Sequence, residues 1–301
     1  MKKSLSFLCL VALVGIVGCG PAATPEPAAA EPDATLESAS DEAPEADDTT
    51  RRDARPPQGR LVQAKAKTAT LRVKFVYDGK PPAPQKIDAS KDPFCAQTDV
   101  LTENMLVNKD GGLRNVALIL DARRSKAEIP AAQLKAPEAV IELDNNKCIF
   151  VPHVIFARPG QTIEVLNSDP VGHNANFNFF NNQAVNFLIP TGGKKQVKLQ
   201  AEEPAPIPVE CNIHPWMRAY TIVTEHPFVG ISDENGVLEI ADLPVGEVSF
   251  KIWHENQEGA IDEGTVDGKT QKYRRGRMEL ELKAGINDLG TIKLAADKFR
   301  D

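Results

Sequence analysis

The sequence lacks the features that mark several large classes of enzyme. It has five histidines in 301 residues, and no two of them form a His-x-His pair. No glycine-rich phosphate loop, paired-carboxylate motif or nucleophile with a neighbouring base stands out. We therefore expect a protein that is not an enzyme.

Positive charge is missing from one long stretch. Residues 20–50 hold nine acidic residues and no basic residue, whereas residues 1–19 hold Lys2 and Lys3. These two stretches account for the whole formal charge of -7, so residues 51–301 are neutral. A neutral folded part gives no support to a nucleic-acid partner.

The apolar run at residues 5–17 is too short to favour a membrane-spanning helix. Residues 1–19 have the pattern of a secretory signal peptide, and Ile-Val-Gly-Cys at 16–19 resembles a bacterial lipobox. The lipobox implies lipidation of Cys19 and a membrane anchor; the alternative is an ordinary signal peptide that is cleaved nearby. Gly20 follows the cysteine, which favours an exported protein at the outer membrane, facing the periplasm.

Residues 20–66 have almost no large apolar side chains and are rich in Pro, Ala and acidic residues. Such a segment cannot bury enough surface to offset its ordering entropy, so we expect a disordered tether. It would either let the folded part reach its partners or only hold it clear of the envelope surface.

From residue 68 the hydrophobic pattern has a period of two, which predicts an all-β protein. Only residues 122–134 are ambiguous, with a short helix as one option. The expected strands are 71–77, 115–120, 139–143, 149–158, 161–167, 196–201, 219–224 and 248–253.

The most specific motif combines Cys211, His214 and Met217 at spacings of three residues, with His173 well upstream. A soft thiolate and thioether favour Cu(I), and imidazole serves both Cu(I) and Cu(II). Two imidazoles, one thiolate and a weak axial thioether form the ligand set of a mononuclear type 1 copper site. The sequence therefore predicts one copper ion per chain.

The loop and following strand, CNIHPWMRAYTIV at 211–223, resemble those of the cupredoxins (blue copper proteins), most closely the amicyanins. The resemblance extends upstream through Phe150, Pro152, residues 160–165, and His173 with Asn174. It implies a Greek-key β-sandwich at 138–225, within the plastocyanin-like class.

The same resemblance assigns roles to single residues. It implies that His173, Cys211 and His214 are equatorial ligands, that Met217 is axial, and that Asn174 binds the two ligand-bearing loops together. His214, flanked by Pro215 and Trp216, would lie at a partly exposed apolar patch where electrons enter and leave. Trp216 is bulkier than the amicyanin residue, and the added β segments leave the redox partners unidentified.

Other metal centres fit the sequence less well. A binuclear copper centre of the cytochrome oxidase type needs a second cysteine where Val209 and Glu210 stand. Multicopper oxidases and copper nitrite reductases need further histidines, and zinc is disfavoured by a single thiolate with Met217.

The C-terminal pattern, FVGISDENGVLEI at 228–240 followed by LPVG at 243–246, resembles the carboxypeptidase regulatory-like (transthyretin-like) β-sandwich. The strands at 71–77 and 115–120 either open that same sandwich, with the cupredoxin inserted, or form a separate unit. The expected divisions are a signal peptide 1–19, a linker 20–66, a β segment 67–137, a cupredoxin domain 138–225 and a second sandwich 226–301.

The remaining cysteines are Cys95 and Cys148, since Cys9 lies in the signal peptide. In an exported chain a leftover pair favours a disulfide, with two unpaired thiols as the alternative. Among the other histidines, His153 alternates with apolar neighbours and is expected to face solvent, while His226 and His254 are assigned to structure or surface.

These observations predict a lipid-anchored, blue copper electron-transfer protein that cycles between Cu(I) and Cu(II) with redox partner proteins. Two alternatives stay open. One is copper delivery or storage, and the other is a structural or adhesive envelope lipoprotein.

Overall fold

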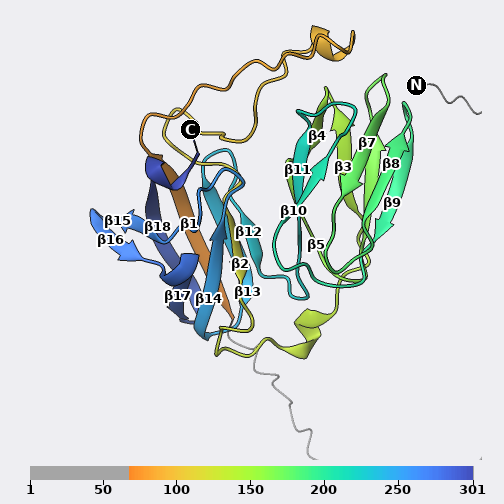
Figure 1. Cartoon of the computed structure of the whole chain (residues 1–301). Coiled ribbons are helices and arrows are strands. Elements are labelled where there is room, and N and C mark those ends of the chain that lie inside the picture. Colours follow the sequence, from red (N-terminus) through yellow and green to blue (C-terminus); the bar gives the residue numbers. More distant parts are fainter. Residues whose placement is uncertain (1–67, 301) are drawn as a thin grey trace, which may run out of the picture. The chain divides into compact units, whose positions relative to one another are not determined.

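The computed structural model describes residues 68–300, so the predicted signal peptide, Cys19 and the tether lie outside the described residues. The described part is all-β, as the sequence predicts (Figure 1). None of its helices is long and apolar enough to span a membrane. The strands are β1 (Ala69–Asp78), β2 (Ala117–Leu120), β3 (Ile141–Asn146), β4 (Ile149–Val151), β5 (Val154–Ala157), β6 (Thr162–Asn167), β7 (His173–Phe177), β8 (Val185–Ile189), β9 (Lys194–Lys198), β10 (Ile207–Glu210), β11 (Arg218–Val223), β12 (Val229–Ile231), β13 (Val237–Leu243), β14 (Gly246–Trp253), β15 (Glu263–Val266), β16 (Lys269–Lys272), β17 (Arg277–Leu282) and β18 (Gly285–Ala295).

Four short 3-10 helices complete the elements: η1 (Cys95–Gln97), η2 (Ala131–Leu134), η3 (Arg274–Gly276) and η4 (Ala296–Lys298). The ambiguous stretch 122–134 therefore contains only the single turn η2. Pro130 at its start is compatible with a first turn, because proline lacks an N–H that an interior helical position would need.

Two sheets contain β3 to β11 and form what we call the ligand sandwich. Their strand orders are β4-β3-β6-β9 and β5-β11-β10-β7-β8. The inward side chains form one apolar core, with Phe150, Phe177 and Leu143 fully buried. This sandwich holds all four predicted copper ligands.

The other two sheets form what we call the split sandwich, with strand orders β13-β1-β18-β15-β16 and β12-β2-β14-β17. Strands β1 and β2 precede the ligand sandwich in the chain, yet β1 lies between β13 and β18, and β2 between β12 and β14. Of the two arrangements considered from the sequence, this pairing corresponds to the one in which the ligand sandwich is inserted between two parts of the other sandwich. The domain boundaries themselves stay a prediction.

Strand β1 shows how the sequence pattern produces a core. Its side chains alternate, and Leu71, Val73 and Phe75 are at most 1% exposed. Successive strand residues point to opposite faces, so alternate apolar residues form one continuous inner surface. Figure 1 shows β1 within the split sandwich, and the long connection to β2 carries η1 away from it.

The predicted strand 149–158 is wrong as a single element. It consists of β4 and β5, which belong to different sheets. Pro152 lies between them, and because proline has no N–H to donate, it interrupts the ladder at the point where the chain changes sheets.

The periodicity argument misses β7, β8, β10, β12, β13 and β15 to β18. Strand β7 has Asn174 and Asn176 among its five residues, and asparagine is depleted in strands. Strand β16 is exposed along its whole length and so has no apolar alternation to detect.

The two sandwiches share a small apolar cluster. Ala117 and Ile119 of β2 pack with Val154 and Ile222 of the ligand sandwich. Tyr220 and Trp253 add an edge-to-face aromatic contact with ring centroids 5.0 Å apart. Such pairs contribute about 0.5–1.5 kcal/mol beyond their buried area.

Candidate metal centre

The ligand loop is a tight connection between two paired strands. Cys211 directly follows β10 and Met217 directly precedes β11, and the last pair of the ladder joins Glu210 to Arg218. Within the loop, the Cys211 N–H donates to the Met217 carbonyl at 3.1 Å, and the Met217 N–H donates to the His214 carbonyl at 2.9 Å. The His214 N–H points at the Cys211 sulfur, 3.4 Å away. These bonds close the loop and place the thiolate and imidazole on the same side.

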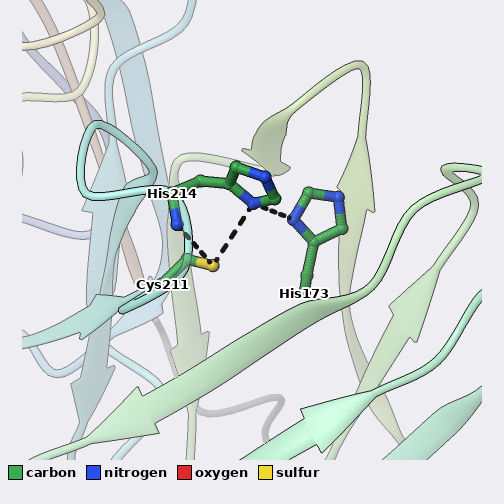
Figure 2. A group of neighbouring side chains, drawn as sticks. All are labelled: His173, Cys211 and His214. Carbon is green, nitrogen blue, oxygen red and sulfur yellow. Dashed lines mark hydrogen bonds between the residues drawn. The ribbon is translucent and has the colours of Figure 1, made fainter. Parts of the chain in front are cut away.

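His173 reaches this loop through strand pairing. It begins β7, and the antiparallel pairing of Asn176 with Glu210 directs the start of β7 past the end of β10, alongside the ligand loop. Figure 2 shows the rings of His173 and His214 facing each other above the Cys211 sulfur. The two Nδ1 atoms are 2.9 Å apart, and the sulfur is 3.7 Å from His214 Nδ1. One ligand atom from each residue lies within 4.8 Å of the others, so the group could hold a metal ion.

All three side chains are removed from solvent, at 0% exposure for His173, 1% for Cys211 and 2% for His214. Burial, followed by the charge of His214, lowers the pKa of His173 and favours its neutral, metal-binding form.

The outer edges of both rings face carboxylates. His173 Nε2 lies 3.0 Å from Asp169, and His214 Nε2 lies 3.4 Å from Asp92. An ionised carboxylate can only accept a hydrogen bond, so a ring that donates from Nε2 to its carboxylate leaves Nδ1 available to a cation. At 2.9 Å the two Nδ1 atoms either share a proton in a hydrogen bond or face a common cation. The donor set therefore fits a metal ion bound by both Nδ1 atoms and the Cys211 sulfur.

Asn174 joins the two segments that supply these ligands. Its Oδ1 accepts from the N–H groups of Asn212 and Ile213, at 2.8 and 3.2 Å, and lies 3.4 Å from the Cys211 sulfur. Its Nδ2 donates to Asn212 and Asn186. These contacts connect the start of β7 to the ligand loop.

Met217 is 1% exposed and belongs to the same apolar core as Cys211. Trp216 is half-buried, its ring centroid lies 5.1 Å from that of His214, and its indole N–H donates to the Cys148 carbonyl at 3.1 Å. Pro215 is exposed. The bulky Trp216 thus fastens the loop to the turn that holds Cys148.

The apolar exposure expected at His214 lies on its neighbour Ile213 and not on the His214 side chain itself. Ile213, next to His214 in the chain, is 50% exposed, whereas the imidazole is covered. Asp92, which lies in the long connection between β1 and β2, is one of the residues that cover the His214 ring. Nothing in the loop sequence indicates this cover, because Asp92 is 122 residues away.

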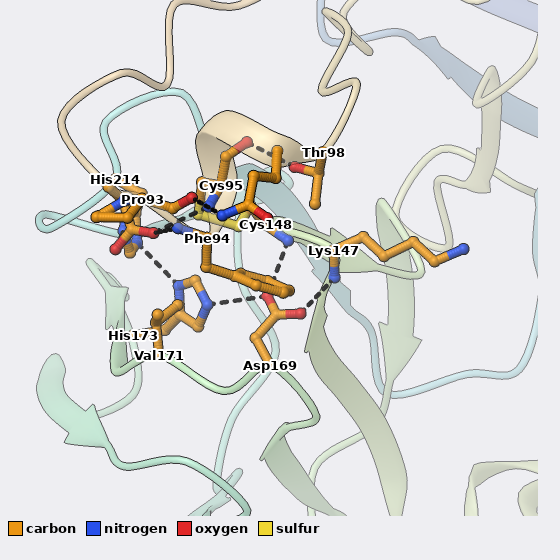
Figure 3. The surroundings of a disulfide bond; sticks show 12 residues. Pro93, Phe94, Cys95, Thr98, Lys147, Cys148, Asp169, Val171, His173 and His214 are labelled. Atoms are coloured by element: carbon orange, nitrogen blue, oxygen red, sulfur yellow. Dashed lines mark hydrogen bonds and ion pairs between the residues drawn. A yellow bond between two sulfur atoms is a disulfide. The ribbon is translucent and has the colours of Figure 1, made fainter.

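Cys95 and Cys148 form a disulfide, with Cα atoms 5.7 Å apart (Figure 3). Cys211 is the free cysteine of the described residues. The disulfide links η1 to the turn between β3 and β4. It lies beside the candidate metal-ligand group, which consists of His173, Cys211 and His214.

The expectation that His153 faces solvent is wrong. It is 7% exposed, and its ring lies between two carboxylates. Its Nε2 contacts Glu255, which follows β14, and its Nδ1 lies 3.6 Å from Glu103 Oε2. Both partners come from outside the ligand sandwich, so no local pattern reveals them. His226 and His254 are buried and structural, since their Nε2 atoms bond the carbonyls of Leu120 and Arg114.

No protein-family profile matches this chain, and no curated protein sequence matches it. Among solved structures, the chain is similar to the Cu-containing nitrite reductase of Thermus scotoductus, at 19% identity and a TM-score of 0.27. That match covers 33% of this chain and 25% of the reductase, so the chain spans only a quarter of it.

A purple cupredoxin of Nitrosopumilus maritimus matches 28% of this chain and 99% of its own, at 20% identity and a TM-score of 0.24. The Cu(I) form of a methionine-to-alanine variant of amicyanin matches 36% of this chain and 99% of its own, at 19% identity and a TM-score of 0.26. The structural neighbours of this chain thus include cupredoxins, over about a third of its length.

Proposed function

We propose that this protein is a mononuclear type 1 copper protein that transfers single electrons and is not itself an enzyme. The observation that carries the proposal is the buried convergence of the Cys211 sulfur and the Nδ1 atoms of His173 and His214. The chemistry of that donor set favours copper over zinc.

Each residue has a distinct role in this proposal. The two Nδ1 atoms and the Cys211 sulfur would hold the copper, and Met217 would supply the weak axial thioether. When bound, copper supplies a one-electron couple between Cu(I) and Cu(II). The chain's own contribution is to exclude water and to hold the ligands still, through the loop hydrogen bonds and Asn174.

The location and partners belong to the same proposal. The lipobox-like Cys19 supports an exported protein anchored to the cell envelope, at the outer membrane and facing the periplasm. Redox partner proteins would exchange electrons with it, and residues 51–301, which carry no net charge, give no support to a nucleic-acid partner.

The test is a visible absorption and EPR spectrum of the purified protein after one equivalent of Cu(II). An intense thiolate-to-copper band with narrow hyperfine splitting, bleached by ascorbate and restored by an oxidant, is the expected result. A protein that binds copper without a reversible couple would indicate delivery or storage. A colourless protein without stoichiometric copper would contradict the proposal and favour a structural envelope lipoprotein.

A further inference from the structure

Two carboxylates beside the metal-ligand group have a second set of contacts. Asp92 Oδ1 accepts the N–H groups of Phe94 and Cys95, both at 2.9 Å. Asp169 accepts the N–H groups of Lys147 and Cys148, at 2.6 and 2.8 Å. Each carboxylate therefore binds the main chain at one cysteine of the disulfide.

The same carboxylates face the two ligand rings. Asp92 Oδ2 lies 3.4 Å from His214 Nε2, and Asp169 Oδ2 lies 3.0 Å from His173 Nε2. Figure 3 shows Asp169 between the His173 ring and the main chain of Lys147 and Cys148. The two cysteines of one disulfide thus donate main-chain N–H groups to two different carboxylates, and each carboxylate contacts a different imidazole.

The turn at Cys148 is shaped for this contact. Strands β3 and β4 pair up to Asn146 and Ile149, which leaves Lys147 and Cys148 as a two-residue loop. Both have positive φ, at 55° and 61°, where glycine or asparagine is usual. Non-glycine residues in this region are strained and persist when their surroundings hold them. The Asp169 carboxylate, which accepts both N–H groups, stabilises this turn.

Asp92 reaches the site by a different route. It lies in the connection between β1 and β2, so it comes from a segment that begins and ends in the split sandwich. Within the described residues, the disulfide is the covalent link between this segment and the ligand sandwich. The link holds Asp92 over a ring that the ligand loop alone would leave uncovered.

A carboxylate that accepts from the distal N–H of a ligand histidine fixes the tautomer and the ring orientation, and raises the basicity of the other nitrogen. Loss of such a partner typically lowers metal affinity about 10- to 100-fold. A more basic imidazole favours Cu(II) over Cu(I), because the higher charge gains more from a stronger donor.

We propose that Asp92 and Asp169 are positioning residues for His214 and His173, and that the Cys95–Cys148 disulfide holds Asp92 in place; this rests on the proposed copper function. The long connection between β1 and β2 is thereby part of the metal centre. Removal of either carboxylate weakens Cu(II) binding more than Cu(I) binding and raises the reduction potential.

The first experiment compares Asp92→Asn with Asp88→Asn in the full chain. The asparagine introduced by Asp92→Asn keeps an oxygen that can accept the main-chain N–H groups but presents an amide to His214. Asp88 is a matched control, because it is exposed on the same segment and accepts the Ser90 N–H at 3.1 Å. The measurements are Cu(II) affinity, reduction potential and the imidazole N–H proton resonances.

We expect Asp92→Asn to lower the Cu(II) affinity about 10- to 100-fold. If Cu(I) affinity is unchanged, the potential rises by about 59 mV for each factor of ten. Asp169→Asn is expected to act in the same direction through His173. Equal potentials and affinities in Asp92→Asn and Asp88→Asn would overturn the proposal for Asp92.

The imidazole N–H proton resonances test the positioning roles independently of whether the protein binds copper. In the metal-free protein, His214 and His173 should each show a downfield, slowly exchanging Nε2–H signal. Asp92→Asn should remove the first signal and Asp169→Asn the second. These losses support the positioning roles even if the wild-type protein proves colourless with copper, whereas signals unchanged in both variants overturn them even if it is blue.

The double variant Cys95→Ala/Cys148→Ala tests the disulfide without altering either carboxylate. Its potential should rise as in Asp92→Asn, and its His214 N–H signal should exchange faster. A folded double variant with the wild-type potential and exchange rate would overturn the role of the disulfide.

Discussion

The ligand sandwich and the split sandwich bury different kinds of side chain. The split sandwich is built around a large apolar cluster, and few polar groups are buried with it. The ligand sandwich buries more of them: Asn145, His153, Arg158, Gln161, Asn167, Asp169, His173, Asn174, Glu203, His214, Thr221 and Thr224. Alternation of apolar residues is thus enough for a β-sandwich, whereas the candidate metal centre also depends on hydrogen bonds among buried polar groups.

Two buried histidines illustrate the same contrast. His254, in the split sandwich, bonds a backbone carbonyl, and burial lowers its pKa to about 4. Burial by itself also lowers the pKa of His153, but Glu103 and Glu255 outweigh it and raise that pKa to about 9. The environment, and not burial alone, decides the charge of a buried histidine.

The largest expected effect is the loss of the visible copper band when the proposed thiolate ligand is removed. Cys211→Ser should abolish the intense visible band completely, because a hydroxyl cannot replace the thiolate that gives type 1 copper its colour. Circular dichroism should still report a folded β protein, since the substitution is nearly isosteric. If the blue colour survives, Cys211 is not a ligand.

The next prediction compares the two cores. Phe75→Ala, in the split sandwich, and Phe177→Ala, in the ligand sandwich, each remove a fully buried ring. Each should lower the free energy of unfolding by about 3–5 kcal/mol, measured by chemical denaturation.

The copper spectrum distinguishes these two variants. Phe177 is four residues after His173 on β7, so its loss should alter the spectrum of the folded protein. Phe75→Ala should leave the spectrum unchanged in the absence of denaturant. A changed spectrum in Phe75→Ala would show that the two regions are less independent than their cores imply.

A smaller effect concerns the contact between the regions, through His153. Its folded-state pKa of about 9 lies above the ordinary value of 6.5. Its charge therefore stabilises the fold fully below pH 6.5, and this contribution is lost as the pH rises to about 9. We expect a loss on the order of 2 kcal/mol in the free energy of unfolding across this range.

Urea denaturation at several pH values measures this loss, with His153→Gln as the comparison. The variant lacks the titrating group, so its stability should change less between pH 6.5 and about 9. Parallel pH profiles for the two proteins would contradict an ion pair at this contact.

The smallest expected effect is a change of potential with copper retained. Met217→Gln should keep the metal bound, because the three equatorial ligands remain, and should lower the reduction potential, because an amide oxygen favours Cu(II) more than a thioether does. Voltammetry measures the shift. Loss of copper from this variant would mean that Met217 does more than tune the site.

The local features of this protein follow from short stretches of its sequence. The period-two pattern of β1 predicts an inward face, and the spacing of Cys211, His214 and Met217 predicts a ligand loop, because both depend on neighbours within a few residues. Even there, Pro152 divided a predicted strand between two sheets.

The surroundings of the site depend on contacts between segments that are far apart in the chain. Asp92 lies 122 residues from His214, and Glu255 lies 102 residues from His153, so no spacing rule connects them. The disulfide and the pairing of β1 with β18 bring distant segments together after the local elements exist. Hydrogen bonds and ion pairs act over a few ångströms in space, whatever the distance along the chain, and this is why the cover over His214 is invisible in the sequence.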